Sequence, residues 1–290
     1  MSVEERDPHS GYLTTGHEWN GIKELNTPVP RAVWFFLILT ALFAVGYWIL
    51  MPTWPLGVTY TKGLLGIDQR VIVSDSLKEA ALDRAALVDR IASAEDAAVQ
   101  GDPQLMAFVR HTGRTLFGDN CAACHGRNAQ GGKGFPNLTT GSWLWGGDPA
   151  TIAETIRVGI NSAHPDSRVA QMLAFGRDGM LPREDIDKVV AYVRSLSAAP
   201  DAPAEPIADG KEIYAANCAS CHGDEGKGKT DVGAPNLTDQ SWIYGGDLQS
   251  IFDTVWHGRQ GHMPTWEARL SAVDRRILAL YLVDLRSAGQ

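Results

Sequence analysis

The sequence predicts a mainly α-helical protein with one N-terminal transmembrane helix followed by two tandem copies of a small helical domain. A run of twenty uncharged residues near the N-terminus predicts the transmembrane helix. A hexapeptide that occurs twice, as CAACHG at 121–126 and CASCHG at 218–223, predicts the two copies, because the segments after it also match in order. No stretch of the repeats shows a convincing strand-like alternation of polar and apolar residues.

Length and composition limit the possible classes of protein. A chain of 290 residues has room for two or three compact units, at about 100–150 residues per domain. Charged residues make up 21% and aromatic residues 8%, which favours globular domains over a disordered chain. The formal charge of −8 argues against nucleic acid as a partner, because binding phosphates requires a basic surface.

The uncharged run covers residues 32–51, AVWFFLILTALFAVGYWILM. Twenty helical residues extend about 30 Å, the thickness of the hydrocarbon core of a bilayer. A cleaved signal peptide fits poorly, because the run is long, starts late and follows an acidic leader. A buried core helix is the third interpretation. We therefore expect an N-terminal segment over 1–31 and one uncleaved transmembrane helix over 32–52.

The matching segments that follow the hexapeptides identify a duplicated domain. PNLT recurs at 136–139 and 235–238, and SWLWGGD at 142–148 corresponds to SWIYGGD at 241–247. An apolar run and a helix-patterned segment close each copy. The predicted boundaries are a helical spacer over 53–102, a first domain over 103–198, an Ala- and Pro-rich linker over 199–206 and a second domain over 207–290.

Helical periodicity is clearest in the segments that close the two copies. Ser271 followed by Asp274 has the form of a capping box, which predicts the start of the last helix. Residues 74–100 have high helix propensity and mixed charge, so we interpret them as a solvated helix without chemistry. The apolar stripes of the closing helices consist of Ile186, Val189, Val190, Val193 and Leu196 in the first copy and Ile277, Leu278, Tyr281, Leu282 and Leu285 in the second.

All four cysteines lie in the two hexapeptides, in the Cys-x-x-Cys-His pattern typical of covalent haem c attachment. The thiols add to the two vinyl groups of haem, and the adjacent imidazole becomes the proximal ligand of the iron. We therefore predict two covalently bound haem c groups per chain and no catalytic residue. The predicted attachment residues are Cys121, Cys124, Cys218 and Cys221, and the predicted proximal ligands are His125 and His222.

Three other uses of Cys-x-x-Cys fit less well. A zinc site would need both pairs to converge, whereas each pair has its own repeat. A thioredoxin-like dithiol would require a βαβ pattern, which is absent. A disulfide would leave both adjacent histidines without a role.

The sixth iron ligand separates electron transfer from ligand binding, since a bound Met or His favours electron transfer. Met263 is the only candidate in the second repeat, while the first offers Met172 and Met180. Met263 lies 18 residues before Tyr281, and Met172 lies 20 before the matching Tyr192, but Met180 only 12. The repeat therefore selects Met172 and Met263 as axial ligands.

Other histidines and aromatic residues have simpler interpretations. His262 or His257 could replace Met263 and give a bis-histidine haem, whereas His111 and His164 are interpreted as polar surface. Four aromatic residues recur at equal places in the repeats, which indicates packing against the porphyrin rather than an electron relay. These are Trp143, Trp145, Trp242 and Tyr244.

The topology follows from the haem prediction rather than from charge. Lys23 and Arg31 on one side balance Lys62 and Arg70 on the other, so the positive-inside rule does not decide. Bacterial haem c attachment takes place on the outer face of the inner membrane. We therefore expect a single-pass inner-membrane protein with a cytoplasmic N-terminus and periplasmic haem domains.

The segment HEWNGIKELNTPVPRAVWFF at 17–36 resembles the membrane entry of the dihaem cytochrome c subunit, CcoP or FixP, of cbb3-type cytochrome c oxidase. The single helix, the spacer and two class I cytochrome c domains are similar too. The resemblance implies haem attachment on the four cysteines and axial pairs of His125 with Met172 and His222 with Met263. Leu173 departs from the Met-Pro pattern that Met263 retains.

The resemblance also implies an electron-transfer subunit that does not reduce oxygen on its own. Such a subunit accepts electrons from a cytochrome bc complex or a soluble cytochrome c in aerobic or microaerobic respiration. It passes them to the monohaem subunit and the haem-copper subunit, which reduces O₂ and drives proton transport. The alternatives are a free-standing membrane-anchored dihaem carrier and a periplasmic dihaem oxidoreductase. The second needs an open iron, against which a methionine in each repeat argues.

Overall fold

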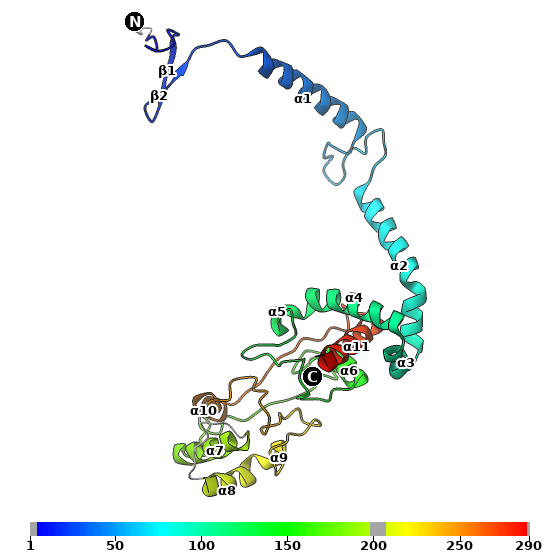
Figure 1. The fold of residues 1–290 in the computed structure, drawn as a ribbon, viewed down its shortest axis with the longest axis vertical. Helices are drawn as coiled ribbons and strands as arrows, with labels where there is room; N and C mark the ends of the chain where they lie inside the picture. The colour runs from blue at the N-terminus through cyan, green and yellow to red at the C-terminus, as the bar shows by residue number, and fades with distance from the viewer. Residues whose placement is uncertain (1–4, 198–206, 289–290) are drawn as a thin grey trace. The chain divides into compact units, whose positions relative to one another are not determined.

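The computed structural model describes residues 5–197 and 207–288, and the predicted mainly α-helical fold is confirmed (Figure 1). The predicted linker at 199–206 lies outside the described residues. The chain divides into two compact units, Met1–Asp83 and Arg84–Gln290. The second unit contains both hexapeptides and therefore both candidate haem sites.

The first unit begins with an antiparallel hairpin that the sequence analysis did not predict. Strand β1 (Thr14–Trp19) pairs with β2 (Ile22–Leu25), and the turn between them is Asn20-Gly21. Both turn residues have positive φ, 51° and 86°, which is the conformation that Asn-Gly adopts readily in two-residue hairpins. The hairpin ends a few residues before the apolar helix begins.

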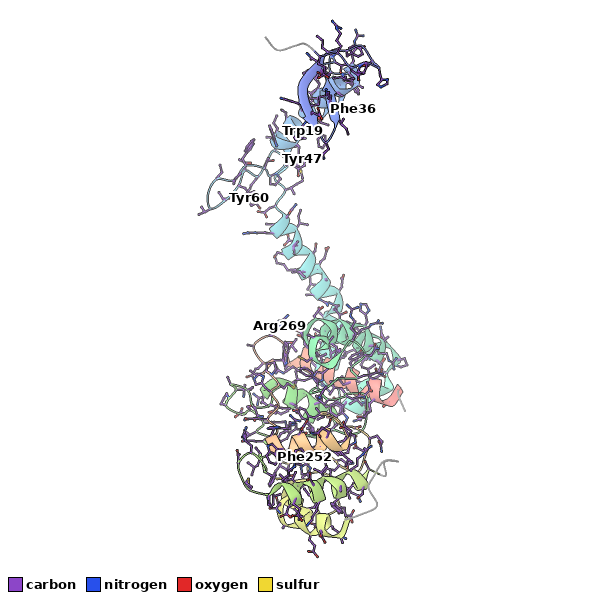
Figure 2. All side chains as sticks on the ribbon, turned by 90° about the vertical axis from the view of Figure 1, so that its left-hand side faces the viewer. Trp19, Phe36, Tyr47, Tyr60, Phe252 and Arg269 are labelled. Atoms are coloured by element: carbon purple, nitrogen blue, oxygen red, sulfur yellow. The ribbon has the colours of Figure 1, made fainter. Side chains whose placement is uncertain are left out.

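Helix α1 (Arg31–Leu50) occupies the uncharged run and has the length and composition needed to cross a membrane. An 18-residue stretch of this helix has a mean hydropathy of 2.2, and none of the helix residues is buried within the chain. The side chains of Phe36 and Tyr47 project outward from it (Figure 2). The following segment folds back, so that the amides of Leu64 and Leu65 donate to the last carbonyls of the helix.

The predicted spacer forms helices α2 (Gln69–Ser93) and α3 (Asp96–Gly101). Most of α2 is exposed, but Ile91 and Val99 are fully buried in the core of the second unit. Arg276 donates to the Asp96 carboxylate at 2.6 Å, which fixes this end of the spacer to the last helix of the chain. The interpretation as a solvated helix was therefore wrong for the end of the spacer, which contributes to packing.

In the second unit, short polar signals define where helices begin. Asp148 and Asp247 cap equivalent helices by accepting from the amides of Thr151 and Ser250. The capping box predicted at Ser271 and Asp274 is present, with reciprocal bonds of 3.2 Å. The helices are α4 (Pro103–Asn120), α5 (Ala122–His125), α6 (Pro149–Val158), α7 (Arg183–Leu196), α8 (Ile207–Asn217), α9 (Ala219–His222), α10 (Leu248–His257) and α11 (Ala272–Ala288).

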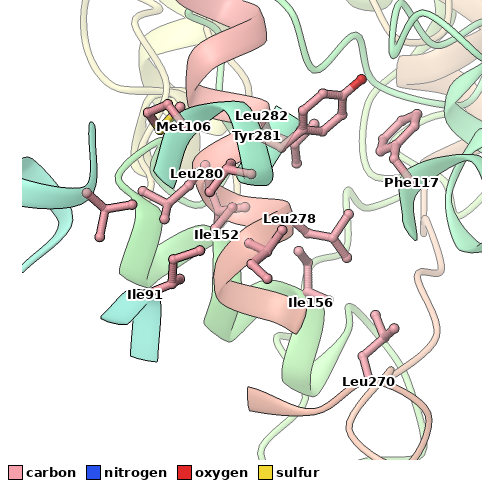
Figure 3. Close-up of a cluster of buried hydrophobic side chains, with 14 of the residues drawn as sticks. Ile91, Met106, Phe117, Ile152, Ile156, Leu270, Leu278, Leu280, Tyr281 and Leu282 are labelled. Atoms are coloured by element: carbon pink, nitrogen blue, oxygen red, sulfur yellow. The ribbon is translucent and has the colours of Figure 1, made fainter. Parts of the chain in front are cut away.

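These helices form two separate hydrophobic cores. Helix α11 packs against α4 and α6, with Phe117, Ile152 and Leu278 among the buried side chains (Figure 3). Helix α7 packs against α8 and α10, around residues that include Ile186 and Tyr214. Each core thus contains the helix before one hexapeptide, the helix that follows it, and a closing helix.

The closing helices are exchanged between the repeats. The predicted boundaries 103–198 and 207–290 stay a prediction, but neither segment packs on its own closing helix, because α7 belongs to the second core and α11 to the first. Tyr281 of α11 lies against Gly113, and Tyr192 of α7 lies against the equivalent Gly210. Both closing helices offer the same apolar face, so each can pack on either repeat, and periodicity does not specify the partner.

Candidate haem sites

The first site is built on the Cys-x-x-Cys-His residues 121–125 and the second site on 218–222. In both, the motif ends in a single four-residue helical turn, α5 or α9, that directly follows a longer helix. The Nδ1 atom of His125 lies 3.1 Å from the carbonyl oxygen of Pro136, and His222 Nδ1 lies 3.1 Å from that of Pro235. A hydrogen bond from Nδ1 to a carbonyl fixes the ring and leaves Nε2 as the ligating atom.

Burial sets the protonation states of these residues. It lowers the pKa of His125 and of His222, which favours the neutral imidazole that ligates a metal. It raises the pKa of the Cys121 and Cys218 thiols to about 11, while the second cysteine of each motif is exposed. Each site therefore has a half-buried cysteine in the core and another at its rim.

The methionines lie in the opposite sites from those expected. Met263 packs in the first core together with Cys121, and Met172 packs in the second core together with Cys218. The structure therefore does not bring together the partners predicted within a repeat, His125 with Met172 and His222 with Met263, and the ligand pairs stay a matter of proposal. The prediction assumed that each repeat closes on itself, whereas the methionine segments cross over together with the closing helices.

Backbone pairing fixes this crossing. Met263 exchanges two hydrogen bonds of 2.9 Å with Ile160, and Met172 exchanges bonds of 2.8 and 3.0 Å with Arg259. Ile160 and Arg259 occupy the same place in the two repeats, two residues beyond α6 and α10. Gly258 permits the approach, because a β-carbon there would lie 2.5 Å from the Met172 carbonyl oxygen.

The rival ligands lie in different surroundings. Met180, the alternative in the first repeat, is 50% exposed, and Met172 remains the candidate. His257, His262 and His111 are exposed, as expected of polar surface. His164 was misjudged, because its side chain is only 9% exposed and Nε2 lies 2.9 Å from Glu267.

The aromatic residues that recur in the repeats test whether haem fits. Among the residues that the structure describes, the buried indole N–H groups of Trp143, Trp145 and Trp242 have no hydrogen-bond partner. Buried donors are rarely left unpaired, so each site calls for an added acceptor. A cavity of about 1010 Å³ between loops of both repeats is lined by Trp143 and Trp242, and by Pro136 and Pro235, whose carbonyls face the two histidines. Haem, with its two carboxylates and large apolar ring, fits these surroundings.

Two arginines in these surroundings were missed by the sequence analysis. Arg168 lies 5.0 Å from the ring centroid of Trp145, and Arg259 lies 4.5 Å from that of Tyr244. Arg168 donates to Thr155 of α6, and Arg259 donates to Thr254 of α10. The two threonines occupy equivalent places in the repeats. Arg168 and Arg259 come from different places in the repeats, so alignment alone does not pair them.

Two helical cores, each with a Cys-x-x-Cys-His turn, an oriented histidine and a packed methionine, define a c-type cytochrome. Family models place the particular family. The N-terminal domain of cytochrome oxidase-cbb3, FixP, matches residues 11–58. Cytochrome c matches 111–197, and cytochrome c oxidase, cbb3-type, subunit III matches 205–282.

Relatives match over nearly the whole chain. The cbb3-type cytochrome c oxidase subunit FixP of Bradyrhizobium sp. (strain ORS 278) is 47% identical over 97% of both chains. The subunit CcoP of Azospirillum sp. (strain B510) is 44% identical over 98% of this chain and 99% of its own. The CcoP of Cereibacter sphaeroides is 42% identical over 94% of both.

The chain therefore belongs to the FixP/CcoP family of cbb3-type cytochrome c oxidase subunits. This confirms the predicted family and the two cytochrome c domains, which imply covalently bound haem c. It also supports α1 as a membrane anchor and the chain as a cytochrome c subunit of an oxidase complex.

Proposed function

We propose that the chain binds two haem c groups, with His125 and Met263 as the axial ligands in the first site and His222 and Met172 in the second. The observation that carries this proposal is the crossed placement of the methionines. Each core holds a histidine oriented by a proline carbonyl and a methionine from the other repeat. Covalent attachment would be through Cys121 and Cys124, and through Cys218 and Cys221.

When bound, haem c supplies one-electron chemistry, because its iron alternates between Fe(III) and Fe(II). The chain's own residues restrict the sites to that use. A histidine and a methionine in each site would occupy both axial positions and exclude small ligands. The unpartnered indoles would donate to the haem carboxylates, and Arg168 and Arg259 would offset their charge. This arrangement favours an electron carrier over a substrate-binding oxidoreductase.

In the complex, the chain would accept electrons from a cytochrome bc complex or a soluble cytochrome c. It would pass them towards the monohaem subunit and the oxygen-reducing haem-copper subunit, without oxidase activity of its own. The haem domains would lie in the periplasm and residues before α1 in the cytoplasm. The family and the outer-face location of haem c attachment support this assignment.

The experiment is purification of the native complex under mild detergent. We expect the chain to copurify with the other oxidase subunits and to carry two covalently bound haems. A chain with Cys121→Ala and Cys124→Ala serves as the matched control and should carry one. If the intact chain elutes free of oxidase subunits, the free-standing carrier is correct instead. Rapid carbon monoxide binding by both reduced haems would favour the oxidoreductase.

A further inference from the structure

The segments that carry the two methionines rest on the ends of α6 and α10, and these contacts are nearly symmetric. In each, the methionine pairs with the backbone two residues beyond the helix. The penultimate residue of α6 is Arg157, and that of α10 is Trp256. The fourth residue after Met263 is Glu267, and the fourth after Met172 is Gly176. These two positions meet in both sites.

In the first site the contact is ionic. Arg157 Nη1 lies 3.1 Å from Glu267 Oε1, and His164 Nε2 lies 2.9 Å from Glu267 Oε2. The amide of Asp166 donates to His164 Nδ1, so the ring proton is on Nε2 and is donated to Glu267. Glu154 and Asp166 hold the other guanidinium nitrogens of Arg157 at 2.8 and 3.2 Å.

Further hydrogen bonds to the backbone of α6 hold the segment between Glu267 and Met263. Thr265 Oγ1 donates to the Arg157 carbonyl oxygen at 2.5 Å, and the Trp266 amide donates to that of Ile156 at 3.1 Å. The segment from Met263 to Glu267 is therefore attached to the end of α6 at both ends.

In the second site the same place is occupied by an aromatic contact. A β-carbon on Gly176 would collide with the indole ring of Trp256, so the ring lies directly on the glycine backbone. Phe252 stacks on Trp256 with ring centroids 5.5 Å apart, and the Arg177 amide donates to the Trp256 carbonyl oxygen at 3.0 Å. Position 176 has no side chain with which to form an ion pair.

We propose that Glu267, held by Arg157 and His164, is a positioning residue for Met263, and that Trp256 on Gly176 has the same role for Met172. The inference rests on the proposed axial ligands. It assigns different physical supports to the two methionines: charge and hydrogen bonding in the first site, and aromatic packing in the second. Disturbing either support should loosen one methionine and leave the other in place.

The test uses the full chain in the purified oxidase complex, with imidazole as the competing ligand. Met263→His and Met172→His first assign the two potentiometric waves to the two sites. Glu267→Ala should increase the apparent imidazole affinity of the Met263 site about fivefold, as loss of a modest ionic contact implies, and shift its wave alone. Trp256→Ala should do the same for the Met172 site. Glu267→Gln, which keeps an acceptor for His164, should restore part of the first effect.

The outcomes are distinguishable. If the wild-type chain lacks the methionine–iron charge-transfer band, the proposed ligands fail. If that band is present but Glu267→Ala shifts both waves, neither wave, or only the Met172 wave, the positioning role fails. Because Glu267 is 46% exposed, its replacement leaves the core intact.

Discussion

Gly113 of α4 lies so close to Tyr281 of α11 that a β-carbon on the glycine would be 2.6 Å from the tyrosine β-carbon. The equivalent Gly210 of α8 meets Tyr192 of α7, where the distance would be 2.8 Å. Both crossings join helices from different repeats. In each core, a glycine from one repeat thus packs against a tyrosine from the other repeat.

Replacing Gly113 tests this crossing. Gly113→Val should reduce the free energy of unfolding by about 1–3 kcal/mol, because the added methyl groups would separate α4 from α11. The measurement is chemical denaturation followed by haem absorbance. Gly118→Ala is the matched control on the same helix, since a β-carbon there meets no atom within 4 Å. It should be neutral or stabilising, and an equal loss in both variants would contradict the close crossing.

The exchange of closing helices predicts which site fails when the C-terminus is lost. A stop codon at Ser271 removes α11, so it should expose α4 and α6 and destabilise the first site, although it is distant in sequence. The second site keeps α7. Limited proteolysis with mass mapping should therefore show new cleavage in α4 and α6. New cleavage confined to α8 and α10 would mean that each repeat closes on itself.

Much of this architecture can be predicted from the sequence. The uncharged run, the duplicated motifs and the capping box at Ser271 are each formed by residues close together in the sequence, so they can be recognised without knowing the tertiary packing. The structure contains the corresponding elements. The exchange could not be predicted, because Tyr192 and Tyr281 lie on equivalent apolar faces that suit either partner. The burial of Ile91 was also hidden, since most of α2 is exposed and only its C-terminal end, from Leu87 onward, packs against the first core.

The crossed methionine pairs can be tested in a chain with one haem. With Cys121→Ala and Cys124→Ala, only the haem of the second site remains. Its reduction potential should fall when Met172 is changed to His, because methionine ligation raises the reduction potential. Met263→His should leave that potential unchanged. Potentiometric titration measures both, and a response to Met263→His alone would restore the pairing within repeats.

Met180 provides a negative control for the ligand assignment. Its side chain is half exposed, so Met180→Leu should change neither potential and neither absorption spectrum. Visible spectroscopy of the oxidised chain, through the methionine–iron band, reports the result. Loss of part of that band in Met180→Leu would assign the ligand role to Met180 instead of Met172.

The cap of α6 predicts a dependence on acid pH. Hydrogen bonds from the side chain and amide of Thr151 lower the pKa of Asp148 below 3.8 in the folded chain. The stability it contributes is therefore present above pH 3.8 and is lost as the pH falls through the lower folded-state pKa. Asp148→Ala should cost about 1 kcal/mol at pH 7 in denaturant titrations.

Asp148→Asn separates the cap from its charge. It keeps an oxygen for the Thr151 amide, so it should retain most of the stability while losing the acid dependence. If Asp148→Asn and the wild-type chain lose stability in parallel below pH 3.8, another carboxylate is responsible.

The exchange of α7 and α11 means that the two halves of the second unit are interlocked rather than merely adjacent. A protease that nicks the chain once between residues 197 and 207 would leave α7 bound to α8 and α10, and α11 bound to α4 and α6. Neither half could depart without opening both hydrophobic cores. During synthesis, the first hexapeptide emerges near residue 121, yet its closing helix is made only from residue 272 onward. The first core therefore cannot close until α11 has been made.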